Sequence, residues 1–105
     1  MTDEYDHILR PFRNKIDSLD DQITELLVER EMIIREVSDI KYEKNVPAIL
    51  QDRVDEVRNR ATAQSILAGS NGQYIKEIYT KIIEVSCDLE NQIFDEKNNN
   101  EKKNL

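Results

Sequence analysis

The sequence contains few residues that interrupt helices or build covalent and metal sites. Its 105 residues include two glycines, two prolines, one cysteine, one histidine and no tryptophan. A lone Cys87 cannot form an internal disulfide, and there is neither an HExxH motif nor a pair of Cys or His at ligand spacing, so we expect no metal site. No Gly-rich loop is present to hold a phosphate. These absences exclude disulfide-built, zinc-dependent and phosphate-loop proteins.

Long apolar runs and an excess of basic residues are also missing. No stretch approaches the roughly 18 apolar residues of a membrane span. The acidic start, MTDEYDHILRPF, lacks the apolar segment of a secretory signal. The net charge of −7 disfavours both nucleic acid and an anionic membrane surface. We therefore expect a cytoplasmic protein whose partners include neither nucleic acid nor membrane.

The sequence does contain many charged residues, 35% of the total, interleaved with apolar residues at helical spacing. This spacing predicts three helices, over residues 8–42, 48–67 and 73–95. Pro47 ends the first segment, and the turn GSNG separates the other two, with Ser70 or Asn71 as the expected cap. We thus predict an all-α domain over residues 1–95 and a frayed or disordered polar tail over 96–105.

The long first segment predicts association with a second copy. About 35 helical residues span about 52 Å, whereas a compact monomer of this length is roughly 34 Å across. Its apolar positions alternate spacings of three and four, which is typical of a heptad seam. We define the seam as Leu9, Phe12, Ile16, Leu19, Ile23, Leu26, Ile33, Val37 and Ile40. A helix too long for a monomer, with one apolar stripe, predicts a homodimer.

Basic residues interrupt or flank this seam. Arg30 occupies the heptad position that follows Ile16 and Ile23, where an apolar residue is expected. A buried cation requires an anion, which can be a bound ligand or an internal carboxylate, unless its stem brings the charge to solvent. Lys41 lies about 20° from Arg30 around the helix and can face the same concavity. Arg13 points about 100° away, toward a partner's site in an antiparallel dimer. Either of these two can also be an ordinary solvated charge.

Two polar residues interrupt the apolar stripe of the third segment. Ser86 and Glu90 are four residues apart and therefore lie on one helix face. A carboxyl group on an apolar face favours its neutral form unless a cation meets it. An ion pair of Glu90 with Lys41 or Arg30 is the alternative interpretation. Arg53, on the second segment, is a further candidate cation or an exposed surface charge.

The stretch FRNKIDSLDDQITELLVEREMIIREVSDIK resembles the first helix of the all-helical chorismate mutases, and YIKEIYTKIIEVS resembles their last helix. The resemblance extends from about residue 9 to residue 92. It implies an intertwined three-helix homodimer with two active sites. It also implies a cofactor-free isomerase of the shikimate pathway and aromatic amino acid biosynthesis. The implied reaction is the pericyclic rearrangement of a small dicarboxylate, chorismate, to prephenate.

The resemblance implies a set of site residues. Carried over, the substrate-binding positions fall on Arg13, Arg30, Lys41, Arg53, Val54, Ser86 and Glu90. Of these, Arg30, Lys41 and Glu90 are the implied catalytic residues, and Arg13 is implied to serve the other subunit's site. The family places Glu directly after the arginine of the second helix and often Asp upstream, where this chain has Val54 and Leu50.

The apolar Val54 leaves two alternatives on the same scaffold, because it resembles 4-amino-4-deoxychorismate mutases and isochorismate-pyruvate lyases. A non-catalytic, dimeric helical interaction module is the alternative from another class. The heptad seam alone supports that module equally well. Polar residues on the apolar stripes favour the enzyme, since a binding scaffold gains little from buried polar groups.

Overall fold

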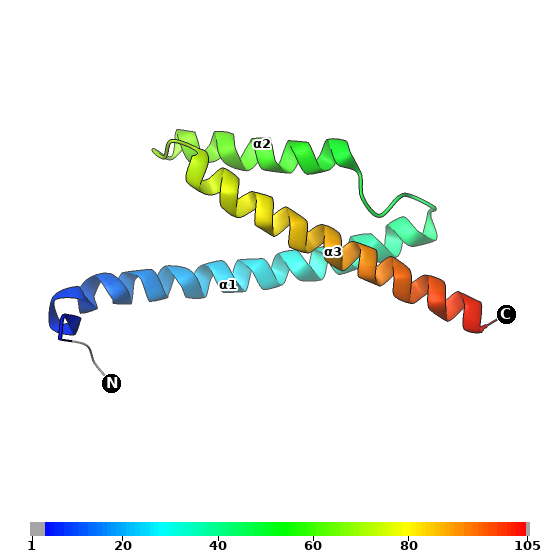
Figure 1. The fold of residues 1–105 in the computed structure, drawn as a ribbon, viewed down its shortest axis with the longest axis horizontal. Helices are drawn as coiled ribbons and strands as arrows, with labels where there is room; N and C mark the ends of the chain where they lie inside the picture. Colours follow the sequence, from blue (N-terminus) through cyan, green and yellow to red (C-terminus); the bar gives the residue numbers. More distant parts are fainter. Residues whose placement is uncertain (1–3, 105) are drawn as a thin grey trace. The chain divides into compact units, whose positions relative to one another are not determined.

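Three helices make up the computed structural model, which describes residues 4–104: α1 (Asp6–Glu43), α2 (Gln51–Leu67) and α3 (Gln73–Lys103) (Figure 1). None of the described residues is in a strand, so the prediction of an all-α fold with a long first helix is confirmed. Residues 1–3 and Leu105, which belong to the predicted domain and tail, lie outside the described residues. No helix in the described part is long and apolar enough to cross a membrane.

The chain divides into two compact units between Ile33 and Ile34, inside α1. We call the described residues before this boundary the N-terminal unit and those after it the C-terminal unit. The N-terminal unit is largely a single helix, with Pro11 close enough to its start that the missing N–H costs little. Its part of the seam is exposed, for example 60% at Phe12 and 62% at Leu26. A lone helix has no second element against which to bury these side chains.

In the C-terminal unit, α2 packs against α3, and the two helices lie side by side in Figure 1. Ile83 and Ile93 of α3 are its buried apolar side chains. Ser38 is completely buried, and its hydroxyl donates to the carbonyl of Ile34 at 2.8 Å. This bond within the helix satisfies a polar group that would otherwise be costly to bury.

Helix α1 ends in a Schellman motif centred on Asn45. The amide of Val46 donates to the carbonyl of Lys41 at 2.8 Å, and the amide of Asn45 donates to that of Tyr42 at 3.3 Å. Asn45 has a φ of 60°. The left-handed conformation costs most residues with a Cβ about 1–2 kcal/mol, and Asn is one of the few that adopt it readily. The predicted break before Pro47 is therefore confirmed.

Helix α2 begins at Gln51, later than the predicted start at residue 48. Leu50 has an extended backbone, with φ −111° and ψ 103°, and its carbonyl accepts the amide of Arg53 at 3.0 Å. The carbonyl of Ala48 accepts a hydrogen bond from the side chain of Lys41 at 3.0 Å. The carbonyl of Ala48 thus binds a side chain, and the first helical hydrogen bonds are accepted by the carbonyl of Leu50.

Helix α2 ends in a second Schellman motif, centred on Gly69. The amide of Ser70 donates to the carbonyl of Ser65 at 2.9 Å, and the amide of Gly69 donates to that of Ile66 at 3.1 Å. Gly69 has a φ of 105° and no atom near the place a Cβ would take. The two motifs have the same hydrogen-bond pattern but use Asn in one case and Gly in the other.

The N-cap residue of α3 is Gly72, with a φ of 90°. The sequence predicts Ser70 or Asn71 at this position, and that prediction is wrong. Asn71 still contributes, because its Oδ1 accepts the amide of Gln73 at 3.0 Å. The Oγ of Ser70 accepts the amide of Gly72 at 3.3 Å. Both predicted side chains therefore stabilise the turn without occupying the cap position itself.

The predicted end of the third helix near residue 95 is wrong, because α3 continues to Lys103. The segment expected to be frayed is helical that far and contacts the end of α1. The hydroxyl of Tyr42 donates to Oδ1 of Asn98 at 2.9 Å, and Lys97 lies 2.9 Å from Asp39. These contacts between distant parts of the sequence stabilise a segment whose own composition is polar.

Tyr42 also packs edge-on against Phe94, with ring centroids 5.3 Å apart. The pKa of Tyr42 is raised, mainly because its partly buried side chain is desolvated. The nearby carboxylate of Glu101 raises this pKa further, through a hydrogen bond and through its negative charge. An open hollow lies beside Tyr42, Phe94 and Glu101 and is also lined by the loop that follows α1. Neither Lys41 nor Glu90 lines this hollow, so it is separate from the predicted site.

Candidate active site

The ammonium group of Lys41 is held by groups from two other segments of the C-terminal unit. Its Nζ lies 3.2 Å and 3.4 Å from the two carboxylate oxygens of Glu90, and it donates to the carbonyl of Ala48 at 3.0 Å. Lys41 comes from the last turn of α1, Glu90 from the middle of α3, and Ala48 from the loop between α1 and α2. A cation in the last turn also interacts favourably with the helix dipole.

The Lys41–Glu90 pair is largely shielded from solvent, with 17% and 12% of the two side chains exposed. Removing one member of such a pair leaves the other charge poorly solvated and without its partner. This ion pair is the alternative interpretation that the sequence allowed for Glu90. It also means that an anionic ligand must displace the carboxylate of Glu90, or share Lys41 with it, in order to reach the ammonium group.

Ser86 lies one helical turn before Glu90 on α3 and is partly buried. Its hydroxyl donates to the carbonyl of Ile82 at 2.8 Å. The hydroxyl is thus oriented by its own helix, in the way that serine commonly satisfies itself in a helix interior.

The structure does not bring Arg53 to the Lys41–Glu90 pair. Its guanidinium pairs with Glu56, one turn further along α2, and 59% of the side chain is exposed. The neighbouring Val54 is partly buried. On α2, therefore, a partly buried apolar side chain lies next to an exposed cation.

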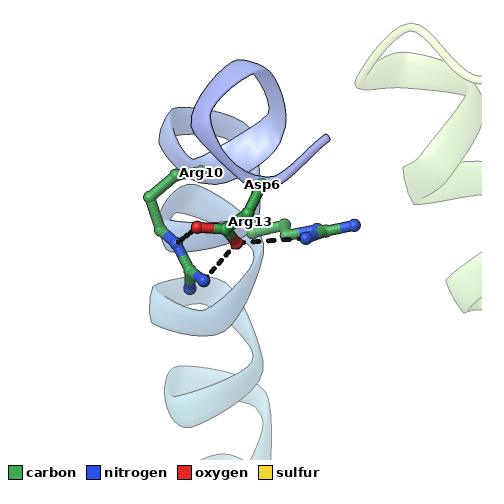
Figure 2. Close-up of polar contacts among 3 residues, drawn as sticks. All are labelled: Asp6, Arg10 and Arg13. Carbon is green, nitrogen blue, oxygen red and sulfur yellow. Dashed lines mark hydrogen bonds and ion pairs between the residues drawn. The ribbon is translucent and has the colours of Figure 1, made fainter. Parts of the chain in front are cut away.

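Arg13 and Arg30 belong to the N-terminal unit. Figure 2 shows the carboxylate of Asp6 between two arginines. Oδ1 of Asp6 lies 3.2 Å from Arg13, and Oδ2 accepts a hydrogen bond from Nε of Arg10 at 3.1 Å. Arg30 is partly buried. The sequence reading missed Asp6, although its spacing of four and seven residues from the two arginines places all three on one helix face.

The backbone carbonyl of Ala48 was also missed. Side-chain patterns do not reveal backbone acceptors, but the sequence NVP just before Ala48 signals a sharp turn after the helix. Such a turn can bring later carbonyls back toward the last residues of α1. The resulting arrangement is a cation of fixed position, which binds the carboxylate of Glu90 and the carbonyl of Ala48.

The fold thus places a shielded lysine of α1 against a carboxylate of α3. Residues 12–91 match the family model described as chorismate mutase type II. Because this match covers most of the chain, the protein belongs to the chorismate mutase type II family, which confirms the resemblance seen in the sequence. No curated protein and no solved structure matched the chain.

Proposed function

We propose that the protein is a chorismate mutase that converts chorismate to prephenate without a cofactor, in the cytoplasm and as part of the shikimate pathway. The observation that carries this proposal is the shielded ammonium of Lys41, fixed by Glu90 and Ala48, in a chain of the chorismate mutase type II family. A pericyclic rearrangement needs no nucleophile. It needs a ligand held in the reactive conformation and a donor for the charge that develops.

In the proposed reaction, the ether C–O bond of chorismate breaks while a new C–C bond forms, within one molecule. Arg13 and Arg30 would bind the two carboxylates, because guanidinium groups form bidentate contacts with them. Holding both carboxylates places the enolpyruvyl group over the ring in a near-attack geometry. Lys41 would donate to the ether oxygen, where negative charge grows in the transition state.

Glu90 is proposed to change partners when substrate binds. In the structure its carboxylate pairs with Lys41. When Lys41 turns to the substrate, Glu90 loses its cation. In its acid form, Glu90 would donate to the ether oxygen together with Lys41. Ser86, one turn away, would turn its hydroxyl proton from the carbonyl of Ile82 to a substrate carboxylate.

This exchange predicts an effect of the charge at position 90. A carboxylate repels the charge growing on the ether oxygen, whereas the amide of Glu90→Gln can donate to it. Glu90→Gln should therefore keep or raise kcat, although it removes the ion pair with Lys41. The measurement is kcat for both proteins. Glu84→Gln, which alters an exposed glutamate of the same helix paired with Lys81, is the control and should keep the wild-type kcat. A large loss of kcat in Glu90→Gln alone would remove Glu90 from this role.

The site residues constrain the substituent on the substrate's ring less than they constrain its two carboxylates. Arg53 would support the open side of the site after leaving Glu56. Val54 cannot accept a hydrogen bond from a ring hydroxyl, and this observation favours a second candidate function. That candidate is a 4-amino-4-deoxychorismate mutase or an isochorismate-pyruvate lyase with the same cationic residues.

The experiment that tests the function is incubation of the purified protein with chorismate, isochorismate and 4-amino-4-deoxychorismate in parallel. We expect prephenate from chorismate, identified by loss of the diene absorbance and by chromatography of the product. Salicylate with pyruvate would instead identify the lyase, and the amino analogue of prephenate would identify the aminochorismate mutase. If no substrate reacts, the protein is not an enzyme of this group, and the interaction module is the better description.

We further propose that the active form is an intertwined homodimer. The occupant of the exposed seam is a second copy of this chain, because the stripe is apolar, keeps heptad spacing over the length of α1, and is uncovered in the N-terminal unit. Burying each large aliphatic side chain contributes about 1.5–3 kcal/mol, and a helix by itself is marginal without such packing. In this dimer, Arg13 serves the site of the other subunit.

A further inference from the structure

Lys41 takes part in both ends of the loop that follows α1. Its backbone carbonyl accepts the amide of Val46 at 2.8 Å, which closes the Schellman motif. Its side-chain ammonium donates to the carbonyl of Ala48 at 3.0 Å. The backbone of Lys41 therefore fixes where the loop starts, and the loop in turn supplies one of the acceptors that orient the ammonium group.

The direction of this loop depends on one backbone conformation. Asn45 is the one non-glycine residue with a left-handed φ among residues 4–104, at 60°. Its side chain is exposed. With an ordinary helical or extended φ at this position, the chain after Asn45 would leave in a different direction, and the carbonyl of Ala48 would not face Lys41.

We infer that Asn45 is a positioning residue, which sets the Lys41 ammonium group by turning the carbonyl of Ala48 onto it. The effect of Asn45 on catalysis rests on the proposed function, but its effect on the position of the Lys41 ammonium group does not depend on any substrate. Glu90 alone would bind the ammonium group from α3. The carbonyl of Ala48, in the loop, restricts the ammonium group further. A group that donates to a single ether oxygen needs such a fixed position.

The protein contains its own control for this inference. Gly69 forms the second Schellman motif in the same unit, with the same pair of hydrogen bonds and a φ of 105°. The two hydrogen bonds of that motif join it to Ser65 and Ile66 and involve neither Lys41 nor Glu90. Valine at Asn45 or at Gly69 therefore introduces the same kind of backbone strain, but only the first is expected to affect Lys41. Glycine at Asn45 keeps the left-handed conformation and removes only an exposed side chain.

The first measurement uses nuclear magnetic resonance of the ligand-free protein with ¹⁵N-labelled lysine. The Nζ signal of Lys41 is assigned by its loss in Lys41→Ala. We expect this signal to stay in place in Asn45→Gly and Gly69→Val, and to move toward the solvent-exposed lysines, with faster hydrogen exchange, in Asn45→Val. If Asn45→Val does not fold, Asn45→Ala introduces a smaller strain at the same site and takes its place.

The second measurement is kcat and KM with chorismate, at a temperature where each variant is folded. We expect Asn45→Gly to retain activity within about twofold, because glycine accepts a left-handed φ. Asn45→Val should lose about tenfold to a hundredfold, mainly in kcat, since small displacements of a catalytic group have effects of that size. Gly69→Val should lower the melting temperature without a comparable loss of kcat.

Three results would overturn the inference: an unmoved Lys41 signal in Asn45→Val, an equal movement in Gly69→Val, or an equal movement in Asn45→Gly. The first would show that the turn does not set the ammonium group. The second would show a general effect of strain, and the third an effect of the Asn side chain. If the wild-type protein does not convert chorismate, the proposed function fails, while the series of Lys41 signals still decides the positioning role.

Discussion

Lys41→Ala should lower kcat for chorismate by about a hundredfold to a thousandfold, which is the usual effect of removing a donor to a developing oxyanion. Nζ of Lys41 is shielded from solvent and bound to Glu90 and to the carbonyl of Ala48. The alanine variant loses the donor and leaves Glu90 without its cation. Steady-state kinetics with purified protein measure the effect, and sedimentation checks that the oligomeric state is unchanged.

The matched control for this variant is Lys81→Ala. Lys81 pairs with Glu84 at 3.1 Å on the exposed face of α3, and 76% of its side chain is accessible to solvent. An exposed pair of this kind contributes little to stability, so Lys81→Ala should behave as wild type in both assays. Retained turnover in Lys41→Ala would exclude Lys41 from the reaction. A loss of the same size in Lys81→Ala would show that the assay responds to charge in general.

Mixing two inactive variants should restore activity if Arg13 acts across the dimer. In a mixed dimer of Arg13→Ala with Lys41→Ala, one of the two sites has an intact Lys41 from the first chain and an intact Arg13 from the second. Random exchange of subunits in a two-fold dimer makes half of the dimers mixed, so about a quarter of the wild-type activity should return. Each variant alone should be nearly inactive.

The measurement is chorismate turnover after the two proteins are unfolded together and refolded at equal concentration. The control mixture is Lys41→Ala with the double variant Arg13→Ala and Lys41→Ala, in which no combination gives an intact site. Recovery in the first mixture alone would support both the dimer and the crossed position of Arg13. Inactivity of both mixtures, with dimers seen by sedimentation, would place Arg13 outside the partner's site.

The sequence predicts the positions of the helices well, because the spacing of apolar residues depends only on residues that are close in the sequence. The first helix and the breaks at Pro47 and at the GSNG turn are found close to their predicted places. Glu90 is predicted because it interrupts an apolar stripe, and Lys41 because it lies about 20° from Arg30 around the helix. Their ion pair was one of two open interpretations, since spacing along a helix does not reveal which group on another helix a side chain meets.

The features that the sequence reading missed depend on contacts between distant segments or on backbone atoms. Nothing in the tail EKNNNEKKNL predicts that α3 continues to Lys103, because the stabilising partners, Tyr42 and Asp39, are on α1. Ala48 acts through its carbonyl, which every residue has. Arg53 illustrates a third case. The resemblance groups it with the site, whereas in the structure a local carboxylate, that of Glu56, binds it.

The ion pair of Lys41 with Glu90 also affects which anions can bind the ammonium group of Lys41. A small monovalent anion such as chloride would have to separate the pair, and it offers the ammonium group no more than the carboxylate it replaces. If the proposed function holds, a ligand with two negative groups would also contact further cations and would overcome that competition. An internal carboxylate of this kind would then favour the binding of divalent acids over that of simple salts.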